Sequence, residues 1–398
     1  SSAASDVYKR QIYNKEMNIL IISRGYPCEG DPIYGIFESD QAKALVKLGH
    51  KVVVLCIDRR FHAPLKRKIG ITKNFVDDIC VYRMFVAPLP INIGLSFTSF
   101  VASLAGSFLF ERIKKECGLP DIIHAHYLFS IPIAVKIGHK YNIPVVVTEH
   151  WSVWNAKKLP REALRLAKKY YPRINSLISV SEALKQAILE KAGYESLVIN
   201  NIVDTEYYNY VENSKVDSGK FIFLSVGTLI KRKGFDLLIK AFKNANFSSE
   251  VSLIIRGDGP EYDSLFSLVT ELQLENRVQF IGKISREEMK ALFNESSVYV
   301  QPSRFETFGV VFIEALACGL PVIATICGGP ENFITSEDGI LIPTEDVDAL
   351  TSSMIEMRNN VSNYNSKAIS NRCISKFSPN IIARQIVDVY NKVLEKEV

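Results

Sequence analysis

Two glutamates, Glu306 and Glu314, are the residues whose types and spacing could most readily do chemistry. A helix that begins near Thr307 or Phe308 would leave Glu306 in the preceding loop and place Glu314 about two turns further along. The first turn of a helix offers unpaired backbone N–H groups and a positive dipole, so it suits a pyrophosphate. Glu314 could then bind a diol such as a ribose, and Glu306 could meet the group beyond the phosphates.

The residues after Gly309 predict the helix that must position this pair. Apolar residues recur there at helical spacing, and Gly319 and Pro321 end the helix before a buried strand at 322–325. The plainer alternative is an ordinary amphipathic helix with a solvated Glu314, since loose motifs match often.

The rest of the chain predicts an α/β protein. Both halves alternate strands and helices, which is typical of doubly wound parallel sheets. We expect one domain at 17–205, a polar linker at 206–220 and a second domain at 221–379. Residues 1–16 lack the apolar core of a signal peptide, and we interpret them as a non-native or disordered leader.

Glycines and histidines lie at the predicted strand ends, where open α/β sheets bind their ligands. Gly35 belongs to a loop between the first strand and the first helix, and glycine lets a backbone approach a phosphate or sugar closely. His126 and His150 each end a buried strand. A lone histidine is more often structural than catalytic, so the place of these two in the fold must decide their role.

The segment from Arg304 to Val322, RFETFGVVFIEALACGLPV, with the GGPE turn that follows, resembles the E-x7-E signature of the retaining glycosyltransferases of family 4. Further motifs extend the resemblance from Met17 to about Lys392 and indicate an enzyme of the bacterial polysaccharide type. The resemblance implies the GT-B fold, in which two Rossmann-like domains face each other across a cleft. It also implies that a C-terminal helix at 380–398 crosses back to the first domain.

The resemblance assigns roles to individual residues. Lys233, in VGTLIKRKG, would neutralise the donor pyrophosphate. Thr228 stands where the family has an arginine, so Lys231 or Arg232 would have to supply the second cation. His150 would orient the sugar near the reacting carbon.

Further roles follow from the same resemblance. Glu306 would hold the sugar hydroxyls, and His126 is a weaker candidate for the acceptor side. The implied donor-binding residues also include Gly35, Gly257, Asp258, Gly259, Thr307, Phe308, Gly309, Val310 and Glu314.

These roles predict a metal-independent hexosyltransferase. It would move a hexose from a UDP- or GDP-sugar to a hydroxyl of a saccharide acceptor, lipid-linked, in cell-envelope or exopolysaccharide synthesis. The resemblance implies retention of configuration, through front-face attack assisted by the departing phosphate. We expect no other cofactor and no metal, because the only D-x-D string, Asp346 to Asp348, is typical of a helix start.

Two other classes remain open. A nucleotide-sugar epimerase on the same fold would turn over the donor without any acceptor. A non-catalytic sugar-nucleotide-binding scaffold would need losses among the site residues, and Thr228 is the departure that the sequence shows.

The first half of the chain is basic and the second half is acidic. Residues 1–200 carry 28 Lys and Arg against 17 Asp and Glu, whereas residues 201–398 carry 20 against 26. The densest basic stretch, from Lys157 to Arg173, is either a solvated helix face or a contact for an anionic membrane surface or lipid diphosphate. No nucleic-acid motif accompanies these cations, so we expect no nucleic-acid partner.

An uncharged run from Met84 to Phe110 also bears on membranes. It is long enough to span a bilayer, yet Pro88 and Pro90 interrupt it and favour a buried or interfacial helix. Seven scattered cysteines without a C-x-x-C pair indicate neither a disulfide framework nor a zinc site. We therefore expect a cytoplasmic protein, or one that is peripheral on the inner membrane face.

Overall fold

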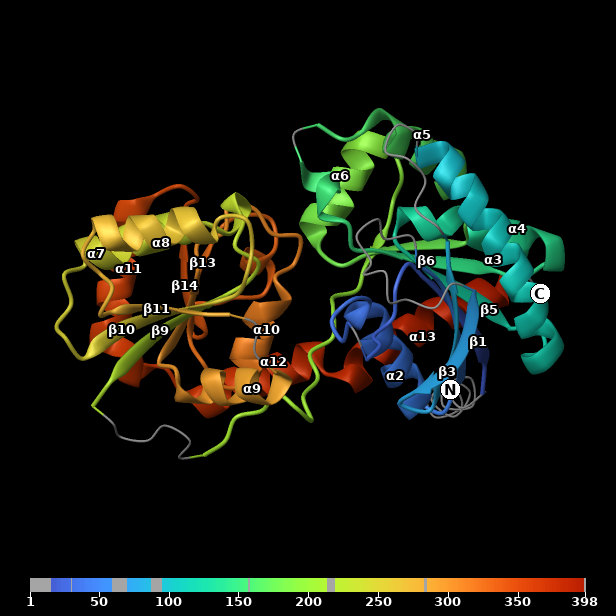
Figure 1. The fold of residues 1–398 in the computed structure, drawn as a ribbon. Helices are drawn as coiled ribbons and strands as arrows, with labels where there is room; N and C mark the ends of the chain where they lie inside the picture. The colour runs from blue at the N-terminus through green and yellow to red at the C-terminus, as the bar shows by residue number, and fades with distance from the viewer. Residues whose placement is uncertain are drawn as a thin grey trace. The chain divides into compact units, whose positions relative to one another are not determined.

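The computed structural model describes residues 16–29, 31–58, 70–86, 95–156, 158–212, 219–282 and 285–396. They form two units, each built around its own sheet (Figure 1). The first unit extends to Ile202 and takes up the chain again from Pro379, and the second unit extends from Val203 to Ser378. The two parallel α/β sheets confirm the predicted fold class.

The first unit contains an eight-stranded sheet in the order β3-β4-β2-β1-β5-β6-β7-β8, which is parallel except at the β3–β4 hairpin. Because β1 lies between β2 and β5, the strand order reverses there, and ligands bind doubly wound sheets at the carboxyl ends of such strands. The strands are β1 Asn18–Ser23, β2 Lys51–Asp58, β3 Ile71–Val76, β4 Ile79–Phe85, β5 Ile122–His126, β6 Val145–Glu149, β7 Ser176–Ser179 and β8 Leu197–Val198.

The C-terminal helix belongs to the core of this first unit. Ile386 and Tyr390 are buried in one apolar cluster with Ile21 of β1 and Leu45 of α2. Figure 1 shows this helix, α13, in red beside α2, although the two are far apart in the sequence. The helices described in this unit are α2 Ile36–Lys47, α3 Leu95–Cys117, α4 Ile131–Tyr141, α5 Arg161–Tyr170, α6 Glu182–Ala192 and α13 Pro379–Glu395.

The uncharged run ends in α3, which packs against α4 and against strands β2 and β4. Leu109, Phe110 and Ile113 are buried on that side of the helix. Across the described ranges, no helix is both long and apolar enough to cross a bilayer. Positions 87–94 of the run, the leader at 1–15 and Lys157 lie outside the described residues.

The second unit contains a six-stranded parallel sheet in the order β11-β10-β9-β12-β13-β14. Here the order reverses between β9 and β12, so the loops that leave these two strands form the second switch point. The strands are β9 Phe221–Val226, β10 Val251–Arg256, β11 Val278–Ile281, β12 Val298–Gln301, β13 Val322–Thr325 and β14 Gly339–Ile342. The helices described here are α7 Phe235–Asn244, α8 Tyr262–Glu271, α9 Arg286–Glu295, α10 Val310–Ala317, α11 Val347–Asn360 and α12 Ser366–Phe377.

Two helix starts in this unit test the sequence predictions. Helix α10 begins at Val310, not near Thr307 or Phe308, because Gly309 has a left-handed φ of 92° that a helix interior does not allow. Glu314 therefore lies about one turn into the helix rather than two. The D-x-D string is a helix start, as predicted, because Asp346 caps α11 by accepting a hydrogen bond from the backbone N–H of Ala349.

Candidate active site

The loop after β9 and the loop after β12 meet at the switch point of the second unit. Lys231–Lys233 form one 3₁₀ turn, and Gly234 follows with a φ of 72°. A side chain at Gly234 would come within 2.0 Å of the carbonyl oxygen of Pro302, so only glycine allows this approach. The close contact brings the cations of the first loop to Glu306 of the second.

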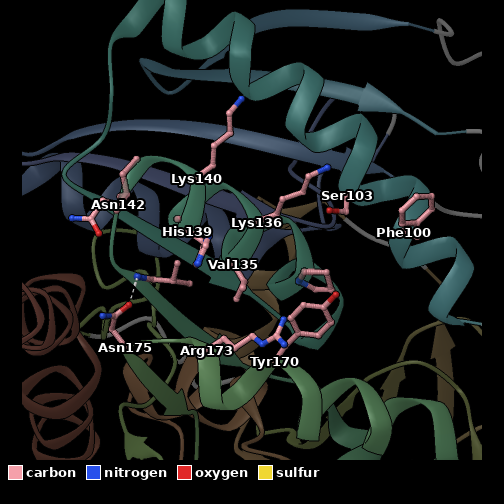
Figure 2. A pocket seen from close by; sticks show the side chains of 14 residues that line it. Phe100, Ser103, Val135, Lys136, His139, Lys140, Asn142, Tyr170, Arg173 and Asn175 are labelled. Atoms are coloured by element: carbon pink, nitrogen blue, oxygen red, sulfur yellow. Dashed lines mark hydrogen bonds between the residues drawn. The ribbon is translucent and has the colours of Figure 1, made fainter.

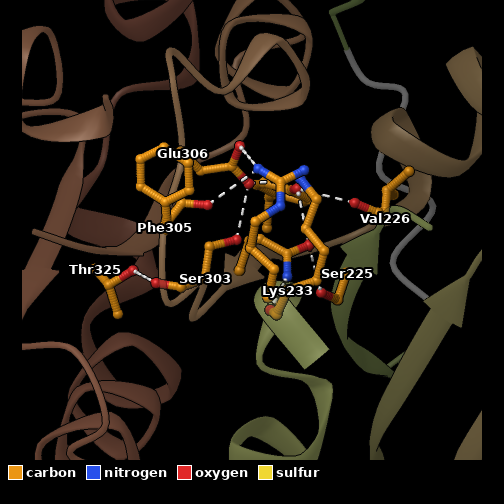
Figure 3. Close-up of polar contacts among 10 residues, drawn as sticks. Ser225, Val226, Lys233, Ser303, Phe305, Glu306 and Thr325 are labelled. Atoms are coloured by element: carbon orange, nitrogen blue, oxygen red, sulfur yellow. Dashed lines mark hydrogen bonds and ion pairs between the residues drawn. The ribbon is translucent and has the colours of Figure 1, made fainter. Parts of the chain in front are cut away.

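Glu306 and Lys233 form a largely buried ion pair. The Lys233 Nζ lies 2.5 Å from the Glu306 Oε1, and these two side chains are 14% and 7% exposed. The Ser303 hydroxyl donates to the same oxygen at 2.8 Å, and the Arg232 Nη1 lies 3.7 Å from the other oxygen (Figure 3). Burial alone would raise the pKa of Glu306, but the charges of Lys233 and Arg232 hold it below its ordinary value. Glu306 is therefore an anion at neutral pH.

Arg232 and Lys231, the two candidates for the second cation, have different surroundings. The Arg232 Nη1 donates to the Phe305 carbonyl at 3.2 Å, next to Glu306. The Lys231 Nζ instead pairs with Asp236 at 2.8 Å, and its side chain is 65% exposed. Arg232 is thus the one that joins Lys233 and Glu306, and we call these three residues the charged cluster.

A network of ion pairs and hydrogen bonds that sequence reasoning missed holds the two loops of the charged cluster in place. The Arg304 guanidinium pairs with Asp236 at 2.8 Å and with Glu345 at 2.5 Å, and it also donates to the Lys231 carbonyl. Hydrogen bonds from Arg304 and Lys231 lower the pKa of Asp236 to about 2, against the opposing effect of burial. The Gln301 side chain donates to the Lys233 carbonyl and so holds the same turn. The alternating charges of KRKGFD and SRFE were the signal available in the sequence.

The glycines predicted to contact the donor have packing roles in the described structure. A side chain at Gly257, whose φ is 152°, would come within 1.9 Å of the Gly227 carbonyl oxygen, and one at Gly259 would meet the Leu229 carbonyl at 2.5 Å. The loops after β9 and β10 therefore touch backbone to backbone. Asp258, between the two glycines, is exposed.

The start of α10 presents backbone rather than side chains. Phe308 is buried against Phe333 and Phe377, with ring centroids 5.1 and 5.7 Å away. Thr307 is 8% exposed, and its buried hydroxyl has no hydrogen-bond partner among the described residues. A hydroxyl of this kind beside the first turn of a helix can bind an anion.

The charges of Glu314 and Glu306 both act on Tyr299, a buried residue of β12. Burial raises the pKa of Tyr299, and the charges of Glu306 and Glu314 raise it further. Glu314 is half-buried on α10 and has interaction partners of its own. The charges of both glutamates of the motif therefore act on one buried side chain.

The switch point of the first unit is a stack of rings. His124, His126 and His150 stack in that order, with ring centroids 4.5 and 5.4 Å apart, and Phe37 and Tyr127 cover His150. His126 Nδ1 and His150 Nε2 are 3.1 Å apart. His126 ends β5 as predicted, whereas β6 ends at Glu149 and His150 follows it.

The three histidines of this ring stack are neutral. Burial lowers the pKa of His150 to about 3, helped by the charge of Arg24, and burial lowers that of His124 to about 3 as well. The pKa of His126 is lowered for the same reason. His126 is fully buried, while His150 is 7% exposed. The ring nitrogens of His124 form hydrogen bonds with the Tyr390 and Thr148 hydroxyls, which hold this residue on its strand.

Three charged residues that sequence reasoning missed surround the ring stack. Glu149 accepts hydrogen bonds from the backbone N–H groups of Leu128, His150 and Trp151 and so joins the loops after β5 and β6. The Arg24 guanidinium lies 3.7 Å from the ring centroid of Tyr127. Glu38, in the first turn of α2, is fully buried, which raises its pKa to about 7.

Gly35 has a backbone reason for its place before α2. Its φ is 85°, and a side chain there would come within 2.3 Å of the Gly25 carbonyl oxygen.

No group of three His, Cys, Asp or Glu side chains that could hold a metal ion occurs within the described ranges.

Comparison with known proteins places this geometry in a family. The model of the family described as Glycosyltransferase Family 4 matches residues 39–207, and the model described as Glycosyl transferases group 1 matches residues 209–372. The chain belongs to the glycosyltransferases of family 4, which have the GT-B fold.

Individual proteins resemble the chain over most of its length. TuaC of Bacillus subtilis, a glycosyltransferase named for teichuronic acid biosynthesis, is 26% identical over 85% of this chain and 88% of its own. The gpi3 subunit of the phosphatidylinositol N-acetylglucosaminyltransferase of Schizosaccharomyces pombe is 26% identical over 78% of this chain and 66% of its own. The crystal structure of Anabaena HepE in complex with UDP and glucose has a TM-score of 0.72 and 21% identity, and it covers 94% of this chain and 99% of its own.

Proposed function

We propose that this glycosyltransferase transfers a hexose from a nucleotide diphosphate sugar to a hydroxyl of a lipid-linked saccharide, with retention of configuration. The observation that carries the proposal is the charged cluster at the second switch point, beside the start of α10. Cations and helix N-termini favour a diphosphate. HepE was solved with UDP, which supports a UDP-sugar as the first donor to test, with GDP-sugars as the second.

In this proposal the second unit binds the donor. Lys233 and Arg232 bind the diphosphate, and Arg232 supplies the charge that Thr228 does not. Glu314 binds the ribose diol, and Glu306, already an anion, accepts hydrogen bonds from sugar hydroxyls. Fixed cations then stabilise the leaving diphosphate without a metal ion.

The reaction breaks the bond between the anomeric carbon and the diphosphate oxygen and forms one between that carbon and the acceptor oxygen. The acceptor hydroxyl gives its proton to the departing phosphate on the same face of the sugar. We assign His150 to the sugar, because a neutral imidazole can orient a hydroxyl without adding charge at the reacting carbon.

The acceptor side of the proposal rests on the basic first half of the chain. A lipid-linked saccharide would bring the enzyme to the inner face of a membrane, where anionic lipids attract cations. The two relatives named for teichuronic acid and phosphatidylinositol glycosylation support an acceptor of this general kind.

A donor screen tests the proposal against both alternatives. Calorimetry with UDP-, GDP- and ADP-sugars should find one tight binder, and NMR of the product should show the anomeric configuration of the donor. Donor turnover without any acceptor would favour an epimerase. Donor binding without turnover, across lipid-linked and soluble acceptors, would favour a scaffold.

A further inference from the structure

A pocket of about 870 Å³ opens on the first unit near the amino-terminal ends of β6 and β7, the edge of the sheet opposite to the histidines. Its walls come from α3, from α4 and from the segment that joins α5 to β7 (Figure 2). None of the roles proposed above uses this pocket. Its lining includes Phe100, Lys136, His139, Lys140, Tyr170 and Arg173.

The pocket lining is basic and contains no carboxylate. Lys140 pairs with Glu111 at 2.7 Å, whereas Lys136 and Arg173 have no ion-pair partner within the described part of the chain. Figure 2 shows Lys136 extending toward Ser103 on α3, with Arg173 beside Tyr170 on the opposite wall. Arg173 lies 5.9 Å from the ring centroid of Tyr170, and neither cation is neutralised by a carboxylate of the described residues, which favours an anionic ligand for this cavity.

An exposed apolar stripe runs along α3 from the mouth of this pocket. Phe100, Leu104 and Phe108 are 58%, 48% and 64% exposed, and their spacing of four residues puts them on one face of the helix. Phe100 also lines the pocket. The stripe and the basic pocket are therefore parts of one surface.

The basic helix α5 extends the positive charge of this surface. It packs against α3 and α4, and its last residue, Tyr170, lines the pocket. Arg165, Lys168 and Lys169 are exposed on it. Cations beside an exposed apolar helix face are the pattern of a membrane-surface contact, in which apolar side chains enter the interface and cations meet the headgroups.

We infer that this surface docks the first unit on an anionic phospholipid bilayer, with a lipid phosphate in the basic pocket and the α3 stripe in the interface. The inference rests on the membrane location proposed above and adds the site that would achieve it. A soluble anion would need the pocket but not the stripe, and the stripe is what favours a bilayer.

Vesicle co-sedimentation of the full chain tests the site. Wild type should bind vesicles that contain phosphatidylglycerol at low salt and should not bind phosphatidylcholine alone. Since each cation near such a surface contributes about fivefold in affinity, K136Q/R173Q should bind about 25-fold more weakly. The variant F100A/L104A/F108A should lose about tenfold or more.

Matched controls separate the site from charge and hydrophobicity in general. K240Q/K367Q removes two exposed cations of the second unit, and F75A removes an apolar side chain that is 69% exposed on β3. Both should bind vesicles like wild type. Every variant should keep wild-type affinity for the donor nucleotide, which shows that it is folded.

The outcomes distinguish this inference from the proposed function. If K136Q/R173Q binds no more weakly than K240Q/K367Q, the pocket is not the docking site, although the membrane location stands. If wild type binds the donor but does not bind anionic vesicles, the bilayer is the wrong partner, and this result does not contradict the proposed transferase function. Inorganic phosphate bound in the pocket without vesicle binding would also overturn the inference.

Discussion

The carboxyl edges of the two sheets share a switch-point topology but hold different groups at their centres. In the first unit the switch point is filled by stacked, buried and neutral histidine rings. In the second unit it holds Lys233, Arg232 and Glu306 as charged groups in contact. The fold thus sets where a ligand can bind, whereas the residues at the strand ends set which charge it can carry.

The same difference makes the two units respond to different perturbations. Acid destabilises a unit that buries neutral histidines, because these histidines bind protons in the unfolded chain but not in the folded chain. A buried ion pair is lost when one partner is removed, because the other charge stays behind. Each response can be measured separately.

Replacing Lys233 should have the largest effect. K233M leaves Glu306 buried without its nearest cation, which costs about 3 to 5 kcal/mol, so the second unit should unfold at lower urea in hydrogen-exchange measurements. Donor affinity should also fall by about tenfold or more. The double variant K233M/E306Q removes both charges and should recover much of the stability. Equal stability of K233M and wild type would contradict the description of a charged, buried edge.

Acid should unfold the first unit before the second. The pKa values of His124 and His150 fall to about 3 on folding from an ordinary 6.5, so this stabilisation is complete above pH 6.5 and declines as the pH falls toward 3. The pKa of Glu38 rises to about 7 on folding, so the protonation of this residue offsets part of the loss of stability. A net uptake of about one proton costs about 1.4 kcal/mol per pH unit.

The two tryptophans, Trp151 and Trp154, both lie in the first unit, so their fluorescence reports on that unit alone. In the second unit the pKa of Asp236 is lowered to about 2. Asp236 therefore keeps its contribution to stability until the pH falls below its ordinary pKa of 3.8. H126Q should flatten the fluorescence profile, while H139Q, an exposed control, should not. If both units unfold at the same pH, the prediction that acid unfolds the first unit before the second is wrong.

Glu314 tests the reach of the donor site beyond the charged cluster. E314A should weaken donor binding by about 1 to 2 kcal/mol, roughly the loss of one charge-assisted hydrogen bond to a ribose diol. Calorimetry with the 2′-deoxy nucleotide is the control, since the variant should lose little further affinity for it. An equal loss for both nucleotides would place Glu314 away from the ribose.

Arg232 and Lys231 form a matched pair of neighbouring cations. R232Q should weaken binding of the nucleoside diphosphate by about 1 kcal/mol and leave the monophosphate nearly unchanged, because Arg232 is the cation that joins Lys233. K231Q, whose cation pairs with Asp236, should change neither by much. The reverse order would assign the second diphosphate cation to Lys231.

Chelation should have the smallest effect. If the cations of the second unit stabilise the leaving diphosphate, transfer should continue at a nearly unchanged rate in EDTA. Activity that disappears with EDTA and returns with Mn²⁺ would show that the charged cluster needs a metal ion.

The architecture was accessible from the sequence because its strands are buried and strongly apolar. Strands such as β1, β6 and β9 read as continuous apolar runs with a loop at each end. The β3–β4 hairpin was not predicted, since β3 is largely exposed at the edge of the sheet and has no apolar pattern. A short strand of that kind takes its conformation from its partner.

The site was only partly accessible, because its contacts join distant loops. The sequence gives Lys233 and Glu306 separately, but their contact depends on the close approach at Gly234. The hydrogen bonds to Glu149 and the ion pairs of Arg304 were missed for the same reason, since each set links segments that only the sheet brings together. Helix α10 starts later than predicted because of the φ angle of Gly309, which the spacing of apolar residues in the sequence does not reveal.

The return of α13 to the first unit sets the order in which the chain can mature during its synthesis. Tyr390, which bonds His124, and Ile386, which enters the apolar cluster, leave the ribosome after every strand of both sheets. Domains usually fold as they emerge, the amino-terminal one first. Here the second unit is complete when Ser378 has emerged, while the first still lacks a helix of its core. The unit that is begun first is therefore the one that is finished last.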